Sequence, residues 1–137
     1  MGSEGDQLRV GVVGVGHLGH YHVQKYAALK EARIVGVFDV DRARAEDVAR
    51  RYGARAFSDL PSLLGEVEAL SLAVPTEHHY EEASRILDHG VHLLVEKPIT
   101  YSVEHAGRLV EAARRKGIVL QVGHVERFNP PVIEMKS

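Results

Sequence analysis

The sequence contains no cysteine, so disulfide bonds and thiolate chemistry are excluded, and any metal site would have to use His, Asp or Glu side chains. Its longest apolar runs are the length of a strand, far below the ~20 residues that a membrane-spanning helix requires. The start, MGSEGDQ, has no apolar signal region. A formal net charge of -2 gives no reason to expect nucleic acid or an anionic membrane as a partner. These absences favour a soluble, cytoplasmic protein.

The length of 137 residues suits one domain with a substantial core. Apolar runs of strand length alternate along the chain with segments in which apolar residues recur at helical spacing. Strands are expected over 8–14, 33–39, 54–57, 69–74, 91–96 and 118–123. Helices are expected over 17–30, 42–52, 58–67, 76–87 and 103–116. This strict alternation predicts an α/β fold, a doubly wound parallel (Rossmann) sheet with helices on both faces in a single three-layer domain.

The predicted helices carry recognisable start and stop residues. Asp41 and Ser102 are suited to cap the helices that follow them, and an Asp or Ser can cap the short helix with Pro61 in its first turn. Glycines follow three helices directly before a strand, where the left-handed conformation ends a helix, namely Gly53, Gly90 and Gly117. In the last helix the spacing predicts one shared face made of Val103, Ala106, Val110 and Ala113.

A glycine-rich motif, Gly14-x-Gly16-x-x-Gly19, lies where the first strand meets the first helix. In a dinucleotide site the first glycine makes the tight turn, the second lets the backbone approach a pyrophosphate, and the third lets the helix pack closely on the strand. The helix N-terminus then receives the anion. We therefore predict cofactor contacts from the three glycines and from His17 and Leu18 at the start of the helix.

Asp39 ends the second strand, 20 residues after Gly19, where an acid can accept hydrogen bonds from the ribose hydroxyls of the adenosine. Such an acid would repel a 2′-phosphate, which favours NAD over NADP. Arg42 and Arg44 follow closely, however, and can accommodate that phosphate. In the alternative interpretation Asp39 is only a turn or helix-capping residue.

In the stretch LLVEKPITY, a predicted hydrophobic strand ends at Glu96, Lys97 and Pro98. In a doubly wound sheet, ligands bind beyond the carboxyl ends of the strands, so this element belongs on the same rim as the glycine loop. A lysine beside a nicotinamide can hold a substrate hydroxyl and transfer its proton as hydride leaves the carbon. Taken alone, the element favours the simpler interpretation of a solvated lysine on a turn.

Four segments in this order, VVGVGHLG, VPTEHHYEEA, HLLVEKPIT and VGHVERFNP, resemble the glucose-fructose oxidoreductase, inositol dehydrogenase and MocA family, written Gfo/Idh/MocA. The resemblance implies a catalytic or substrate-contacting role for Lys97, with Glu96 and Pro98 near the nicotinamide. It also implies that further residues lie along the cofactor cleft, namely Val74, Pro75, Thr76, His79, His124 and Arg127. The segment GHVERFNP resembles members that act on nucleotide-linked amino sugars.

Members of this family continue into a second α/β domain that covers the nicotinamide. We therefore expect a disordered leader at 1–7, the dinucleotide-binding domain at 8–124, and at 125–137 the start of a connection to a C-terminal domain that the chain lacks. The chain would then be the NAD-binding half of a dehydrogenase for a sugar, cyclitol or nucleotide sugar, inactive alone. Its uncovered rim around Phe128, Pro130 and Val132 would favour a homo-oligomer.

Two other hypotheses fit parts of the sequence. A stand-alone dinucleotide sensor would need the glycine loop and Asp39 but has no evident use for Lys97. A metal site would draw on the nine histidines, above all His17, His20 and His22 or the pair His78 and His79. No acidic residue completes either set at a spacing typical of metal ligands, so no metal is expected.

Overall fold

The computed structural model describes residues 7–96, 99–100 and 102–123. Within these residues the order is β1 (Leu8–Val13), α1 (His17–Ala28), β2 (Ala32–Phe38), α2 (Arg42–Tyr52), β3 (Arg55–Ala56), α3 (Leu60–Leu64), β4 (Ala69–Leu72), η2 (Thr76–His78), α4 (His79–Asp88), β5 (His92–Glu96), α5 (Val103–Lys116) and β6 (Leu120–Gly123). The predicted alternation is confirmed, with one refinement: the segment after Pro75 begins as a 3₁₀ turn before it continues as α4.

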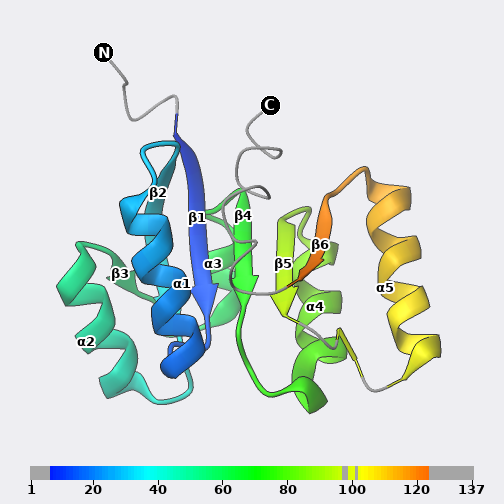
Figure 1. Cartoon of the computed structure of the whole chain (residues 1–137), viewed down its shortest axis with the longest axis horizontal. Coiled ribbons are helices and arrows are strands. Elements are labelled where there is room, and N and C mark those ends of the chain that lie inside the picture. The colour runs from blue at the N-terminus through cyan, green and yellow to red at the C-terminus, as the bar shows by residue number, and fades with distance from the viewer. Residues whose placement is uncertain (1–6, 97–98, 101, 124–137) are drawn as a thin grey trace.

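The strands form one sheet in the order β3-β2-β1-β4-β5-β6, and every neighbouring pair is parallel. This is the strand order of a doubly wound dinucleotide-binding fold, so the predicted fold class is confirmed. The chain order reverses between β1 and β4. In Figure 1 the visible arrows of β1, β4 and β5 point the same way, and α1 lies beside β1 at the centre of the sheet. A ligand cleft is expected beyond the carboxyl ends of β1 and β4.

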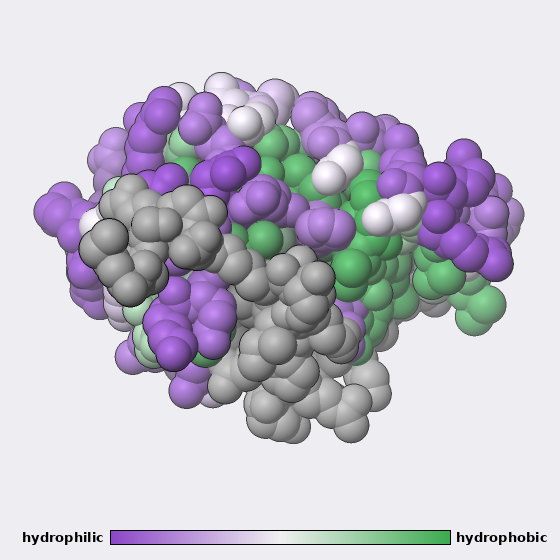
Figure 2. All heavy atoms as spheres, turned by 90° about the horizontal axis from the view of Figure 1, so that it is seen from above, coloured by the Kyte–Doolittle hydropathy of each residue, from purple (hydrophilic) through white to green (hydrophobic). Residues whose placement is uncertain are grey.

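The two faces of the sheet bury separate apolar clusters. Alternation along β1 sends Val10 and Val12 into the cluster under α1 and α2, and Val13 into the cluster under α3, α4 and α5. In β5, Leu94 joins the first cluster while Leu93 joins the second. Strands buried on both faces explain the nearly continuous apolar runs of the sequence. In the view of Figure 2, hydrophilic residues occupy much of the outer rim and hydrophobic residues gather between them.

The predicted caps are confirmed. The Asp41 and Asp59 carboxylates accept backbone N–H bonds from Arg44 and Ser62 at 3.1 and 2.8 Å. The Ser102 hydroxyl accepts the N–H of His105 at 3.2 Å. The three stop glycines all have positive φ, namely Gly53, Gly90 and Gly117.

The predicted apolar face of α5 is only partly buried. Val103 and Val110 are 90% and 53% exposed, whereas Leu109 and Ala113 are buried in the cluster with α4. The helix is rotated relative to the prediction because burying the larger Leu109 removes more apolar surface from water than burying the valines. No helix among the described residues is long and apolar enough to span a membrane.

Candidate cofactor site

Gly14 makes the turn that leaves β1. Its φ is +87°, and a Cβ at this position would lie 2.7 Å from the Ala73 carbonyl oxygen. The Gly14 N–H donates to the Phe38 carbonyl at 2.8 Å, and the Ala73 N–H donates to the Val13 carbonyl at 2.8 Å. The turn is therefore wedged between the ends of β2 and β4, where only glycine fits without strain.

The other two glycines of the motif differ from each other. A Cβ on Gly19 would lie 1.6 Å from the Gly14 carbonyl oxygen, so this glycine lets α1 pack directly on the loop. A Cβ on Gly16 would meet only the Nη1 atom of Arg44, at 3.5 Å. The space beside Gly16 is therefore free of backbone, as the close approach of a ligand requires.

The N-terminus of α1 is left open to an anion. Gly16 is its N-cap, with no side-chain capping bond and no acidic residue in the first turn. By contrast, side chains cap α2, α3 and α5. The first N–H groups of a helix have no intrahelical acceptor and carry the positive end of the helix dipole. They can therefore hold a phosphate beside Gly16.

The Asp39 carboxylate, 8% exposed, is fixed between the glycine loop and the start of α2. One oxygen accepts the Val15 N–H and the other accepts the Asp41 N–H, each at 2.8 Å. Since each carboxylate oxygen can accept more than one hydrogen bond, both can also accept from a ligand hydroxyl.

The two arginines after Asp39 point to different partners. The Arg44 guanidinium lies 3.7 Å from the Asp39 carboxylate and 3.6 Å from that of Asp41. Arg42 instead pairs with Glu46 along the helix, at 3.1 Å. Arg44 is therefore the arginine placed at the site, a distinction that sequence spacing did not make.

A cleft of about 290 Å³ opens at the switch point between β1 and β4. It brings together five predicted site residues, namely Gly14, Gly16, Asp39, Val74 and Pro75. Arg44, which can accommodate a 2′-phosphate, also lines the cleft. The other lining residues were not predicted from the sequence, namely Val13, Phe38, Val40, Ala73 and Glu82. The motif residues that reach the cleft thus come from the loops after β1, β2 and β4.

Other predicted residues do not line this cleft. His17 and Leu18 border a separate cavity of about 440 Å³ along α1, and Thr76 begins the 3₁₀ turn. The buried His79 ring places its two nitrogens 2.9 Å from the carbonyl oxygens of Val74 and Ile99, and so joins two loops. Its contact with cofactor stays a prediction. The predictions for Lys97, Pro98, His124 and Arg127 fall outside the described residues.

Glu96, at the end of β5, belongs to a polar network that sequence reasoning missed. His22 lies 3.0 Å from the Glu96 carboxylate and 3.1 Å from the Ser71 hydroxyl, which lies 2.6 Å from the Tyr26 hydroxyl. Burial lowers the pKa of His22 to about 4 and raises that of Tyr26. The available signal was polar residues at positions where the pattern demanded apolar ones: His22 and Tyr26 on the buried face of α1, and Ser71 inside β4.

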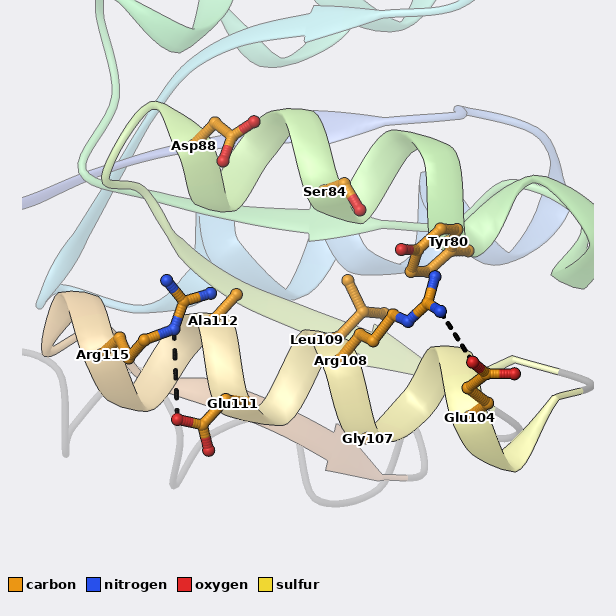
Figure 3. Close-up of a pocket in the computed structure, with 10 residues that line it drawn as sticks. All are labelled: Tyr80, Ser84, Asp88, Glu104, Gly107, Arg108, Leu109, Glu111, Ala112 and Arg115. Carbon is orange, nitrogen blue, oxygen red and sulfur yellow. Dashed lines mark hydrogen bonds and ion pairs between the residues drawn. The ribbon is translucent and has the colours of Figure 1, made fainter.

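Another cavity, of about 520 Å³, lies elsewhere, between α4 and α5. Figure 3 shows charged side chains around it, with Arg108 between Tyr80 and Glu104 and with Glu111 paired to Arg115. Its lining comes from α4 and α5 and includes no residue of the glycine loop or of the loop after β2. Among the described residues, no group of three or more His, Asp or Glu side chains is placed to hold a metal ion.

Residues 8–124 match the family model described as an oxidoreductase family with an NAD-binding Rossmann fold, GFO_IDH_MocA. The chain belongs to this family. The resemblance read from four sequence segments is thereby confirmed. This places the glycine loop, the uncapped helix and the cleft in an NAD(P)-binding Rossmann domain of the Gfo/Idh/MocA oxidoreductases.

Curated relatives include sugar and cyclitol dehydrogenases. The UDP-N-acetylglucosamine 3-dehydrogenase of Acidithiobacillus ferrooxidans is 43% identical over 125 residues, which are 91% of this chain and 39% of that protein. The scyllo-inositol 2-dehydrogenase (NAD⁺) of Bacillus subtilis is 33% identical over 134 residues, 95% of this chain and 39% of that protein. The chain thus spans about two fifths of the length of these relatives.

Solved structures of family members superpose closely on the fold. The Acidithiobacillus ferrooxidans dehydrogenase has a TM-score of 0.84 and 42% identity over 95% of this chain and 42% of its own. GenD2 from gentamicin A biosynthesis, in complex with NAD, has a TM-score of 0.83 and 34% sequence identity, over 85% of this chain and 34% of its own. KijD10, a 3-ketoreductase from Actinomadura kijaniata in complex with NADP, has a TM-score of 0.81 and 28% sequence identity, over 85% of this chain and 37% of its own. Both cofactors therefore occur among its structural relatives.

Proposed function

We propose that this Gfo/Idh/MocA chain binds NAD in the cleft at the β1–β4 switch point and is the cofactor-binding half of a dehydrogenase. The observation that carries the proposal is the uncapped N-terminus of α1 beside the open space at Gly16, facing the fixed carboxylate of Asp39. A packing role alone would explain Gly14 and Gly19, but it would not require an open, uncapped helix end at Gly16.

The described residues fit a dinucleotide in a defined direction. The N–H groups at the start of α1 would hold the pyrophosphate, and Asp39 would accept from the ribose hydroxyls. Val74 and Pro75 would form the wall that continues toward the end of β5. The bound nicotinamide supplies the hydride acceptor or donor. Lys97, directly after β5, would hold the substrate hydroxyl and move its proton.

The proposed substrate class is a sugar, cyclitol or nucleotide-linked sugar with a reacting hydroxyl carbon. The dehydrogenases named above support it, and the 43% identity to a UDP-N-acetylglucosamine 3-dehydrogenase favours a nucleotide-linked amino sugar. Because the chain spans only about two fifths of these relatives, we propose that it binds cofactor but does not turn over substrate alone. Formation of NADH from NAD and UDP-N-acetylglucosamine by the isolated chain would contradict this point.

Gly16→Ala tests the cofactor site. The added Cβ meets only a flexible arginine tip, so the variant should fold with a stability close to that of the wild type. The methyl group would occupy the space of the pyrophosphate, and NADH affinity measured by fluorescence titration should fall at least about tenfold, roughly 1.4 kcal/mol. Gly107→Ala, in open space on α5, is the control and should bind normally. Absence of wild-type binding at millimolar NADH, or normal binding by Gly16→Ala, would contradict the proposal.

Cofactor preference should depend on Asp39 and Arg44. We expect the wild type to prefer NAD over NADP by about tenfold, because the fixed carboxylate repels a 2′-phosphate. Asp39→Asn should reduce this preference for NAD, because it removes the negative charge that repels the 2′-phosphate. Arg44→Ala should weaken NADP binding more than NAD binding. The Arg44 guanidinium lies beside the Asp39 carboxylate, where the 2′-phosphate of NADP would be bound. Arg42→Ala, which disrupts only a pair with Glu46, is the matched control. Equal effects of the two arginine variants on NADP affinity would argue against this assignment.

A further inference from the structure

A buried hydrogen-bonded network connects the helix of the glycine loop to the end of β5. His22 and Tyr26 on α1 and Ser71 on β4 are each at most 1% exposed, and the Glu96 side chain is 12% exposed. The contacts run from Tyr26 to Ser71 at 2.6 Å, from Ser71 to His22 at 3.1 Å and from His22 to Glu96 at 3.0 Å. The network therefore connects α1, β4 and β5 on one face of the sheet.

The chemistry of the four groups fixes the direction of these hydrogen bonds. An ionised Glu96 carboxylate can only accept, so the facing Nε2 atom of His22 must carry the proton. Burial holds the pKa of His22 at about 4, so the ring is neutral near pH 7 and its Nδ1 atom must accept from the Ser71 hydroxyl. Ser71, which gives its proton to His22, then accepts from Tyr26. Every donor points along the relay toward Glu96.

We propose that His22 is a positioning residue that orients the Glu96 carboxylate at the carboxyl end of β5, through a relay anchored at Tyr26 and Ser71. The inference deepens the proposed function, on which it rests in placing Glu96 at the nicotinamide end of the cleft. The N-terminal end of α1 lies at the glycine loop, and Glu96 directly precedes Lys97 in the sequence. One helix thus connects the pyrophosphate end of the site with the strand end that carries the proposed proton-transfer residue.

A role in packing alone does not account for these residue types. Burying polar and charged groups costs free energy that a hydrophobic cluster of equal volume would avoid. Tyr26 belongs to a hydrophobic cluster that also contains Val23 on α1 and Leu94 on β5. A polar relay in such surroundings holds its last member in one orientation, which an apolar side chain facing Glu96 would not do.

The first test measures the relay itself, without any cofactor. In the ¹⁵N-labelled chain, NMR of the His22 imidazole should show a neutral ring with the proton on Nε2 at pH 7. A ring protonated on Nδ1, or one that averages between the two tautomers, would overturn the proposal. This measurement uses the wild-type chain and so does not depend on how well any variant folds.

The second test separates positioning from packing by comparing two ligands. His22→Gln keeps an amide N–H near the Nε2 position, whereas the shorter His22→Asn keeps a partner for Ser71 but does not reach Glu96. We expect His22→Asn to weaken NADH binding about tenfold while ADP-ribose, which lacks the nicotinamide, changes by less than about twofold. His22→Gln should restore most of the NADH affinity.

Equal weakening of both ligands, or identical behaviour of the glutamine and asparagine variants, would show that His22 acts only through packing and would overturn the proposal. If the wild-type chain bound neither ligand, the proposed function would fail, and the tautomer of His22 would still decide whether the relay exists.

Discussion

Replacing Gly19 with alanine is expected to remove a large part of the folding stability of the chain. The new Cβ would lie 1.6 Å from the Gly14 carbonyl oxygen and 2.6 Å from its carbonyl carbon. Both are backbone atoms, and the Gly14 backbone is held in place because its N–H donates to the Phe38 carbonyl at 2.8 Å. Relief therefore requires α1 to move off the sheet, which uncovers Val23 and Tyr26. We expect a loss above about 4 kcal/mol, against a typical total of about 5–15 kcal/mol.

Urea unfolding followed by circular dichroism measures this loss. Gly107→Ala on α5 is the matched control, because its Cβ has nothing within 4 Å and alanine favours the helix. It should raise the free energy of unfolding by about 0.5–1 kcal/mol. A Gly19→Ala variant within 1 kcal/mol of the wild type would contradict the close packing of α1 on the loop.

The features that sequence analysis predicted well are local ones. Asp41 and Ser102 cap helices through atoms three residues away, and Gly53 and Gly117 end helices through their own φ angles. The buried face of α5 was predicted only in part, because small and medium apolar residues occupy several of its faces. Only packing against α4 decides which of them turns inward, and that packing selects Leu109.

The same division holds for the candidate site. The glycine motif could be predicted because its three positions lie within six residues and each has a distinct steric reason. The relay to Glu96 could not, because its contacts join residues 45, 49 and 74 positions apart. Those contacts exist only once β4 lies beside β5 and α1 covers that part of the sheet, which the alternation of strands and helices alone does not specify.

Folding stability should fall as the pH drops from about 6.5 to about 4, through His22. Burial lowers the pKa of this ring from 6.5 to about 4. Between these values the unfolded chain binds a proton at His22 while the folded chain does not, so acid favours unfolding. The contribution is fully present above pH 6.5 and decreases toward pH 4, and the shift corresponds to about 3 kcal/mol at most.

His22→Gln isolates this effect, because it has no group to titrate and every other ionisable residue is kept. Chemical unfolding at a series of pH values should show the wild type losing up to about 3 kcal/mol relative to the variant between pH 7 and pH 4. Above pH 7 the difference between the two proteins should not change with pH. A difference that stays constant down to pH 4 would mean that His22 titrates alike in the folded and unfolded chains, and so that burial does not keep its ring neutral. The same neutral ring is what lets Nδ1 accept from Ser71 while Nε2 donates to Glu96.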